Sequence, residues 1–233
     1  MKSTILIISC EHAVNTVPPE YQHLFEKNKS ILESHHAIDF GSLAIAKRLS
    51  ESLNCEYTQS NVTRLLVDCN RNGNHTHCFS DYTKLLSKTE KQQLLTQFHH
   101  PFHQQTKGLI QASIDSNQQV LHLSIHSFAP VLNGNIRNAG IGLLYDSHRH
   151  GEKEVARQWS SLLIHQTAYR IRMNYPSSCI NEGFINSLRK RYVERDYLGI
   201  ELQINQALLQ DAESLDEIVD ALSISLRELM QLL

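Results

Sequence analysis

The stretch Thr4-Ile-Leu-Ile-Ile-Ser9, which runs directly into Cys10-Glu11-His12, decides how the chain folds. It is a short apolar run rich in β-branched residues, which is typical of a buried strand. Similar runs recur along the chain and alternate with longer segments of helical period. The predicted strands are Thr4–Ser9, Cys55–Thr58, Arg64–Val67, Val120–Ile125, Ile141–Tyr145, Ala168–Met173 and Gly199–Ile204.

Three helices are predicted between and after these strands. One spans Ile38–Leu53, and a second opens at Ser87-Lys-Thr-Glu90, a capping box, and runs toward Ile114. The last carries an apolar stripe from Leu215 to Leu233, which we interpret as core packing. The alternation predicts an α/β fold with a mostly parallel or mixed central sheet and helices on both faces. Chemistry in such folds gathers at the carboxyl ends of the strands.

Composition excludes several classes of protein. The chain has 233 residues with 24 acidic against 22 basic side chains, a net charge of −2, which argues against a nucleic-acid or anionic-membrane partner. A hydrophobic content of 41% argues against disorder. Because no linker or repeat interrupts the chain, we expect one domain over residues 1–233.

The apolar run near the start is too short for a signal peptide or a membrane span, so we expect a soluble cytoplasmic protein. Its cysteines are odd in number and form no CxxC pair. We therefore expect reduced, mostly buried thiols rather than disulfides or a thiolate zinc site. These are Cys10, Cys55, Cys69, Cys78 and Cys179.

The chain holds 14 histidines, an excess that invites a metal or acid-base hypothesis. Two of them, His12 and His126, directly follow predicted strands and would project into a shared crevice. Together with a carboxylate they match a three-ligand zinc site that leaves one position open for water. Glu11 and Asp39 are the carboxylate candidates, and Asp39 is favoured because adjacent residues on an extended loop point apart. His35, four residues before Asp39, would share a helix face with it and orient it.

The segment Thr63-Arg64-Leu-Leu-Val-Asp68-Cys-Asn70-Arg71 brings planar donors to a predicted strand. Arg64, Asn70 and Arg71 suit a substrate carboxylate, since guanidinium groups bind carboxylates in bidentate fashion. The alternative is that Arg71 and Asp68 form only a structural ion pair.

The last predicted strand places Glu201, Gln203 and Asn205 on one face. On an edge strand this face would simply meet water. If this face is covered, burial of the Glu201 carboxylate is energetically costly, which favours a functional role for it. Beside a metal, Glu201 would accept a proton from water and pass it to a leaving amine.

Several segments together resemble the N-formylglutamate amidohydrolases, in order and over nearly the whole chain. The matching segments are Ser9-Cys-Glu-His12-Ala-Val-Asn15 with Val17-Pro18, His35-His-Ala-Ile-Asp39-Phe-Gly41, Arg64 with Asp68-Cys-Asn70-Arg71, Pro101-Phe-His103, His126-Ser-Phe128 with Pro130, Ile141-Gly-Leu-Leu-Tyr-Asp146 and Asn174-Tyr-Pro176.

This resemblance implies a fold like that of zinc carboxypeptidases and aminoacylases, in which an Asp-x-Asn-Arg element binds the substrate carboxylate. A looser similarity to zinc-dependent N-acetylmuramoyl-L-alanine amidases supports His12, Asp39 and His126 as ligands and Glu201 as base. The chain departs from the pattern in three places. Asn15 stands where aminoacylases carry a Glu ligand, Val14 replaces a usual Gly, and in one alignment Gln203 takes the position of the family's glutamate.

These observations predict a metal-dependent amidohydrolase that acts on an acidic N-acyl amino acid such as N-formylglutamate, and the resemblance implies that the divalent metal is zinc. Glu201 would be the base, Arg64 or the metal would polarise the scissile carbonyl, and Arg64, Asn70 and Arg71 would hold the substrate's carboxylates. The alternative is a non-catalytic binder of an acylated amino acid or peptide that has lost its general base, as Gln203 suggests.

Overall fold

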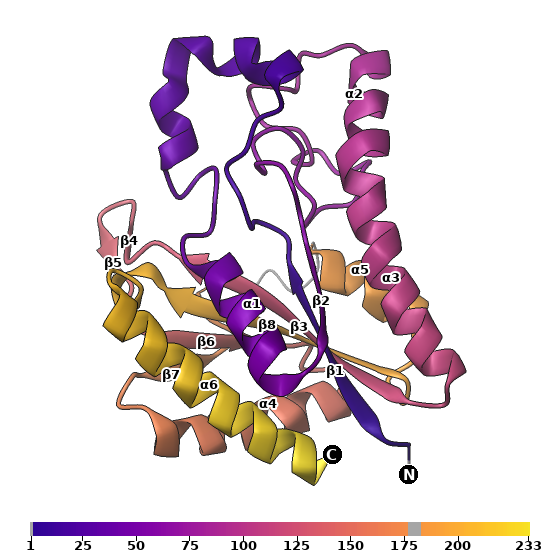
Figure 1. Ribbon diagram of the computed structural model, residues 1–233, viewed down its shortest axis with the longest axis vertical. Helices are drawn as coiled ribbons and strands as arrows, with labels where there is room; N and C mark the ends of the chain where they lie inside the picture. The colour runs from indigo at the N-terminus through magenta and orange to yellow at the C-terminus, as the bar shows by residue number, and fades with distance from the viewer. Residues whose placement is uncertain (1, 177–182) are drawn as a thin grey trace.

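The computed structural model describes residues 2–176 and 183–233. Its centre is a six-stranded sheet in the order β2-β1-β3-β8-β6-β7 (Figure 1). All neighbouring strands run parallel except β6 and β8, which are antiparallel. The sheet is therefore mixed, and a separate hairpin is formed by β4 and β5. The strands are β1 (Thr4–Cys10), β2 (Glu56–Gln59), β3 (Gln119–Phe128), β4 (Val131–Leu132), β5 (Asn135–Ile136), β6 (Ile141–Leu144), β7 (Ile171–Met173) and β8 (Tyr197–Asn205).

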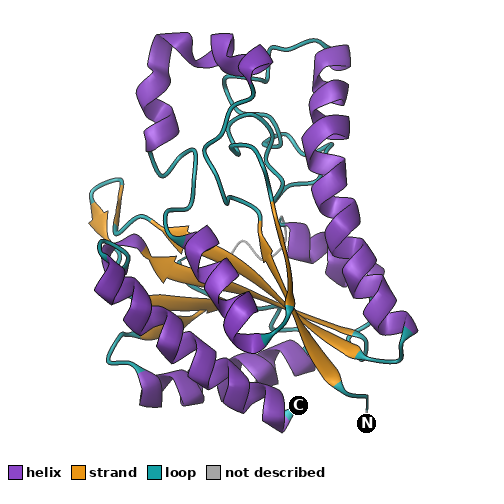
Figure 2. Ribbon diagram, viewed as in Figure 1, coloured by secondary structure: helices purple, strands orange, loops and turns teal. Residues whose placement is uncertain are grey.

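Helices cover both faces of this sheet, which confirms the predicted α/β fold class (Figure 2). Helices α1, α4 and α6 pack on one face, and α3 and α5 pack on the other. The helices are α1 (Ser42–Leu53), α2 (Lys88–Leu94), α3 (His100–Asp115), α4 (His150–Gln166), α5 (Phe184–Arg191) and α6 (Ala212–Leu232), with a π-helical segment η2 (Leu95–His99) and 3₁₀ segments η1 (Pro19–Glu33) and η3 (Gln206–Leu208).

The strand β1 shows how the sequence builds both layers. Because side chains alternate along a strand, Leu6 and Ile8 enter the core with α1 and α6, whereas Ile7 joins the core with α3 and α5. Ile8 is 0% exposed, and burial of such a side chain contributes roughly 1.5–3 kcal/mol. The predicted stripe of α6 is likewise buried, as Leu222 and Leu226 illustrate, so its assignment to the core is confirmed.

Helices α2, η2 and α3 form one continuous rod from Lys88 to Asp115. Its start is the predicted capping box: the Glu90 backbone N–H donates to Ser87 Oγ, and the Ser87 N–H donates to the Glu90 carboxylate. The rod therefore begins where the sequence predicts. The π-helical turn at Leu95–His99 interrupts its otherwise α-helical pattern.

Beyond the carboxyl ends of β1 and β2 lies an upper lobe, which we define as residues 19–33 (η1), 60–87 and 88–94 (α2) (Figure 1). The predicted strand Arg64–Val67 is wrong, since these residues form a turn within this lobe. Leu66 and Val67 are buried in a separate cluster with Phe25 and Leu94. Their apolar character reflects this burial rather than strand pairing.

The predicted helix Ile38–Leu53 begins later than expected, at Ser42. Gly41 has a φ of 77°, a left-handed conformation that favours glycine and that separates the preceding turn from α1. His35 and Asp39 therefore lie in a non-helical segment, and the expectation that they share a helix face is wrong.

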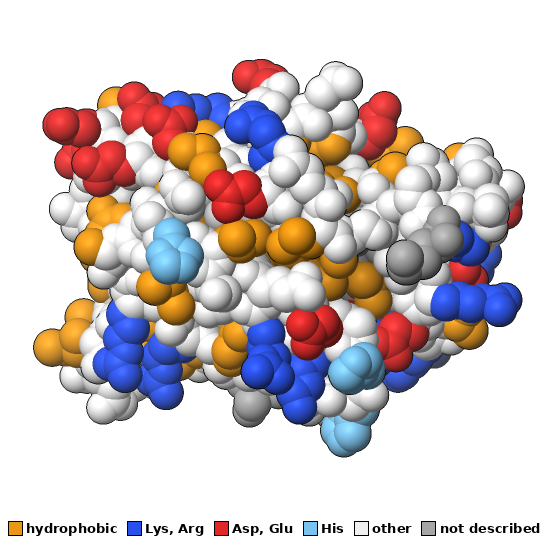
Figure 3. Space-filling view, turned by 90° about the horizontal axis from the view of Figure 1, so that it is seen from below, with side chains coloured by type: hydrophobic (Ala, Val, Ile, Leu, Met, Phe, Trp, Pro, Cys, Tyr) orange, Lys and Arg blue, Asp and Glu red, His pale blue; other side chains and the backbone are white. Residues whose placement is uncertain are grey.

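The remaining expectations concern membrane spans, the distribution of surface charge and the state of the cysteines. Among the described residues, no helix is both long and apolar enough to cross a membrane. On the face seen in Figure 3, acidic side chains gather in the upper left of the view and several basic ones lie along its lower part, so neither kind covers the face. Cys10, Cys55, Cys69 and Cys78 are free thiols, and Cys179 lies outside the described residues.

Candidate metal centre

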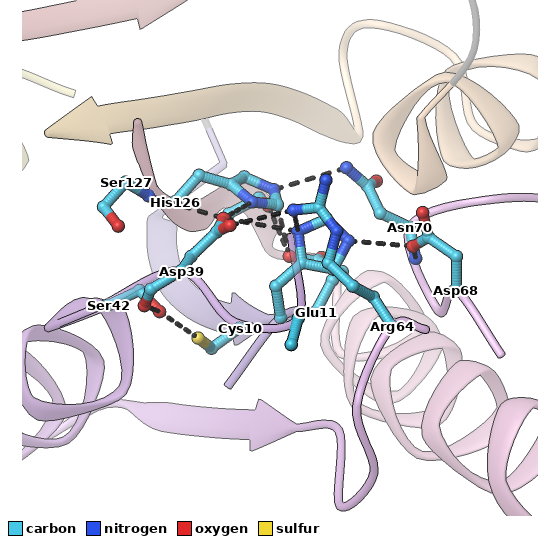
Figure 4. A network of polar contacts seen from close by, with 12 residues as sticks. Cys10, Glu11, Asp39, Ser42, Arg64, Asp68, Asn70, His126 and Ser127 are labelled. Atoms are coloured by element: carbon cyan, nitrogen blue, oxygen red, sulfur yellow. Dashed lines mark hydrogen bonds and ion pairs between the residues drawn. The ribbon is translucent and has the colours of Figure 1, made fainter. Parts of the chain in front are cut away.

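Three side chains predicted as metal ligands meet at the carboxyl ends of β1 and β3, which are central strands of the sheet. Figure 4 shows two of them, Asp39 and His126, pointing toward each other. His12 follows β1, and His126 lies near the carboxyl end of the neighbouring parallel strand β3. Because β3 extends to Phe128, His126 is inside the strand rather than after it. Asp39 comes from the turn before α1, and all three residues are buried.

The backbone of Asp39 is fixed from both sides. Its N–H donates to the His12 carbonyl at 3.1 Å, and its own carbonyl accepts from the Ser42 N–H at 3.1 Å. The Ser42 hydroxyl also donates to this carbonyl and accepts from the Cys10 thiol. These contacts tie the turn before α1 to the end of β1, which places the Asp39 carboxylate beside the two imidazoles.

The candidate ligand atoms lie within 4.8 Å of one another. Asp39 Oδ2 is 2.8 Å from His126 Nδ1 and 3.3 Å from His12 Nδ1. Two imidazole nitrogens and one carboxylate oxygen form a donor set that suits Zn²⁺ and leaves a position open for water or substrate.

The opposite nitrogen of each ring meets further partners. His12 Nε2 is 2.8 Å from Asp68 Oδ1, and His126 Nε2 is 3.0 Å from Ser124 Oγ and 3.4 Å from Glu11 Oε2. Donation from Nε2–H leaves each Nδ1 with a lone pair that faces the Asp39 carboxylate. Two electron-rich atoms repel unless a proton or a cation lies between them. Arg64 Nη1 lies 3.1 Å from His12 Nδ1 and 2.9 Å from Asp39 Oδ1, so its guanidinium supplies positive charge on the His12 side. Between His126 Nδ1 and Asp39 Oδ2 a proton or a metal ion can supply it.

Electrostatics in the cluster support the same interpretation. Burial would raise the pKa of Asp39, but His12, His126 and Arg64 hold it well below its usual range. Burial would lower the pKa of His126, yet the hydrogen bond to Asp39 and the nearby Glu11 raise it to about 9. The pocket floor therefore attracts positive charge, which a proton or a metal ion can supply.

The predicted substrate-binding residues lie around this cluster. Arg64 donates from Nη1 to Asp39 Oδ1 at 2.9 Å, so its guanidinium contacts the ligand set itself. Asn70 Oδ1 accepts from the Phe184 N–H at 2.8 Å, and its Nδ2 lies 3.4 Å from His126 Nε2. Arg71 lines the pocket, with Nε 4.0 Å from Asp68 Oδ2.

Glu201 and Gln203 both line the same pocket, which has a volume of about 350 Å³. They lie on β8 between β3 and β6, so the interpretation of this face as an edge that meets water is wrong. Glu201 is 8% exposed, and burial raises its pKa. A Cβ on Gly183 would lie only 3.2 Å from Glu201 Oε1 and 3.0 Å from Asn70 Oδ1. The absence of a side chain at Gly183 therefore lets its backbone lie close to both Glu201 and Asn70.

Sequence reasoning missed several contributors. The sequence marks Glu11 as a ligand candidate and Asp68 as part of the Asp-x-Asn-Arg element, but it does not predict that Asp68 lies 2.8 Å from His12 Nε2 and Glu11 3.4 Å from His126 Nε2. Arg137 and Gln206 also line the pocket, and neither is singled out by a sequence motif. His35, predicted to orient Asp39, lines the pocket as well, but no hydrogen bond joins the two side chains among residues 2–176 and 183–233.

Comparison with known proteins decides the family. The family model described as N-formylglutamate amidohydrolase matches residues 4–210. The chain belongs to the N-formylglutamate amidohydrolase family. The predicted resemblance is thereby confirmed. No curated protein gives a significant match.

Two solved structures with TM-scores of 0.70 or more share the fold. A gene product from Agrobacterium tumefaciens superposes with a TM-score of 0.80 at 23% identity, covering 99% of this chain and 91% of its own. An N-formylglutamate amidohydrolase from Ralstonia eutropha gives a TM-score of 0.70 at 14% identity, and the match covers 97% of this chain and 92% of the other. An N-acetylmuramoyl-L-alanine amidase from Clostridium difficile gives 0.47 at 14% identity, covering 98% of each chain.

Proposed function

We propose that this protein is a metal-dependent amidohydrolase that releases formate, or another small carboxylic acid, from an acidic N-acyl amino acid such as N-formylglutamate. Family membership supports the reaction class. The observation that carries the proposal is the convergence of His12 Nδ1, His126 Nδ1 and the Asp39 carboxylate at the floor of a pocket that arginines also line.

His12, Asp39 and His126 would hold the metal, with Zn²⁺ favoured by this donor set. When bound, such an ion polarises an amide carbonyl and lowers the pKa of water. Asp68 and Glu11 orient the two imidazoles from behind, and such partners typically change metal affinity or activity by about 10–100-fold.

Glu201 is the proposed general base. Its buried carboxylate lines the pocket close to the candidate ligands, and its raised pKa suits a group that accepts a proton and returns it to the leaving amine. Gln203 has no group that can accept a proton at neutral pH, so it would serve only to hydrogen-bond the substrate.

Arg71 and Asn70 are proposed to bind a carboxylate of the substrate. Arg64 contacts Asp39 and His12, so we propose that it holds the candidate ligands in place rather than binding this carboxylate. It would also stabilise the negative charge that develops on the scissile carbonyl oxygen. An acidic substrate fits these arginines, because guanidinium and carboxylate groups form charge-assisted hydrogen bonds.

The decisive experiment compares Glu201→Gln with the matched variant Gln203→Ala. Formate release from N-formylglutamate and the metal content of the purified protein are measured for both. Loss of a general base typically lowers kcat by about 10²–10⁴-fold, so Glu201→Gln should show this loss with unchanged metal content. The kcat of Gln203→Ala should fall far less than that of Glu201→Gln.

Three outcomes contradict parts of the proposal. Full activity of Glu201→Gln would mean that another group is the base. Wild-type protein that neither binds a divalent metal nor hydrolyses formyl, acetyl or succinyl amino acids would overturn the proposed function. Saturable binding of these compounds without turnover would instead favour the non-catalytic binder.

A further inference from the structure

Two histidines of the helical rod contact the backbone on either side of Asn70. His103 Nε2 lies 2.8 Å from the carbonyl oxygen of Cys69, and His99 Nε2 lies 2.8 Å from the carbonyl oxygen of Arg71. Both side chains are buried. The loop that carries the candidate carboxylate-binding residues is thus held at two adjacent points by one element.

The chemistry of these contacts fixes the protonation of both rings. A carbonyl oxygen can only accept, so each histidine must donate from Nε2–H. His99 Nδ1 is buried and has no hydrogen-bond partner among residues 2–176 and 183–233, as expected for the bare nitrogen of a neutral ring. Burial lowers the pKa of His103 to about 3 and also lowers that of His99, so both are neutral near pH 7.

Packing holds the two rings in place. Their centroids lie 4.0 Å apart at an interplanar angle of 26°, and the Phe184 ring lies 4.2 Å from that of His103. Neutral rings stack without charge repulsion. His99 ends the π-helical segment η2 and His103 follows one turn later in α3, so both project from the same side of the rod.

The opposite side of the loop is tied to the candidate metal centre. The Asn70 N–H donates to Asp68 Oδ1 at 2.8 Å, and the same oxygen contacts His12 Nε2 at 2.8 Å. The Phe184 N–H, at the start of α5, donates to Asn70 Oδ1. A shift of the Cys69–Arg71 backbone would therefore change where Asn70 and Arg71 stand relative to the metal ligands.

We propose that His99 and His103 are positioning residues that hold the Cys69–Arg71 backbone so that Asn70 and Arg71 can bind the substrate's carboxylate. They act through this loop and touch neither substrate nor metal. The inference rests on the proposed function, because it assigns carboxylate binding to the loop.

The test uses pairs of variants of the full-length protein at each position. His99→Leu and His103→Leu remove the donor, whereas His99→Gln and His103→Gln keep an N–H donor on a side chain of similar reach. His100→Leu is the matched control, because no hydrogen bond from its ring to the loop is present in the described part of the chain. Measurements are backbone hydrogen exchange over residues 69–73, metal content, and kcat and KM for N-formylglutamate.

One hydrogen bond is worth about 0.5–1.5 kcal/mol, which corresponds to as much as about a tenfold effect. The Leu variants should therefore show about tenfold faster exchange over residues 69–73 and about a tenfold higher KM. Their kcat and metal content should stay near wild type. The Gln variants and His100→Leu should resemble wild type in every measurement.

Unchanged exchange in both Leu variants would overturn the positioning role, and faster exchange with unchanged KM would overturn the link to substrate binding. A parallel loss of metal and kcat would show that the histidines act on the metal ligands instead. If one Leu variant fails to fold, the other makes the same test. If the wild type hydrolyses no N-acyl amino acid, the proposed function and the link to substrate fail together, while the exchange data still decide whether the histidines hold the loop.

Discussion

The two faces of the central sheet are made by the same strands but bury different chemistry. Along β3, Leu123 and Ile125 point into the apolar core with α1, α4 and α6, whereas His122, Ser124 and His126 point to the other face. On the first face Leu121, Leu123 and Ile125 are all buried in the apolar core, and a polar side chain, Ser127, follows only near the carboxyl end of β3. The second is apolar only toward the amino ends of the strands and becomes polar toward the candidate metal centre.

The polar face remains buried because its groups are partnered. Tyr197 Oη lies 2.8 Å from His122 Nδ1, and His122 Nε2 lies 2.8 Å from Ser9 Oγ. Ser9 and Ser124 each donate to one oxygen of the Glu11 carboxylate at 2.6 Å. Buried polar groups are tolerated when hydrogen-bonded, so this chain lets one sheet carry a stable core and a polar site. The comparison predicts that substitutions on the apolar face mainly lower stability, whereas substitutions on the polar face mainly lower activity.

The largest expected effect on function comes from the polar face. Asp39→Ala removes the carboxylate that faces both candidate ligand histidines, so bound metal and formate release should both fall to background. Circular dichroism should show that the fold persists, because Asp39 belongs to neither apolar core. Metal content by elemental analysis and activity after added Zn²⁺ are the measurements. Retention of a full equivalent of metal would contradict the assignment of Asp39.

On the apolar face the expected effect is on stability. Leu123 is 0% exposed, and Leu123→Ala should lower the free energy of unfolding by about 2–5 kcal/mol through lost burial and a cavity. Activity per folded molecule should remain near wild type. Denaturant unfolding gives the free energy, and kcat is normalised to the folded fraction. A selective loss of kcat in fully folded protein would mean that the two faces are coupled.

The smallest expected effect concerns pH and the polar face. Burial lowers the pKa of His122 to about 4, with Glu11 partly opposing the shift, so the folded protein keeps this ring neutral. Between pH 6.5 and 4 the unfolded chain binds a proton at this residue that the folded chain does not, and stability falls as pH decreases. One such proton changes the free energy of unfolding by about 1.4 kcal/mol per pH unit.

His122→Gln removes this titrating group, so the pH dependence of the free energy of unfolding between pH 4 and 6.5 should become shallower by about 1.4 kcal/mol per pH unit. The dependence above pH 6.5 should not change. Urea unfolding of both proteins between pH 4 and 7, at a fixed metal concentration, measures the difference. Identical slopes would mean that His122 is not held neutral in the folded protein.

The sequence predicted those parts of the fold and site that depend on local pattern. Strand β1, the capping box at Ser87 and the buried stripe of α6 follow from periodicity and spacing. The convergence of His12 and His126 follows from their positions near the carboxyl ends of β1 and β3, and these adjacent parallel strands then bring them together.

The rest depends on contacts between distant parts of the chain. The turn at Arg64–Val67 looks like a strand because its apolar residues are buried, but they pack in the upper lobe. The contacts of His99 and His103 are to backbone carbonyls, which leave no sequence signal. Glu11 adjoins His12 yet lies behind His126, a relation that only the pairing of β1 with β3 creates.

The reversed direction of β6 has a consequence for how selectivity could be tuned. Since β6 is antiparallel to β8, Ile141 at its start pairs with Ile204 near the end of β8, so the chain enters β6 from the pocket side. The segment between β3 and β6, which includes the β4–β5 hairpin and Arg137, is thus an excursion anchored in the sheet at both ends. Its length and side chains can change while the strands that carry His126 and Glu201 keep their register, so the pocket rim is separable from the floor that holds the candidate metal ligands.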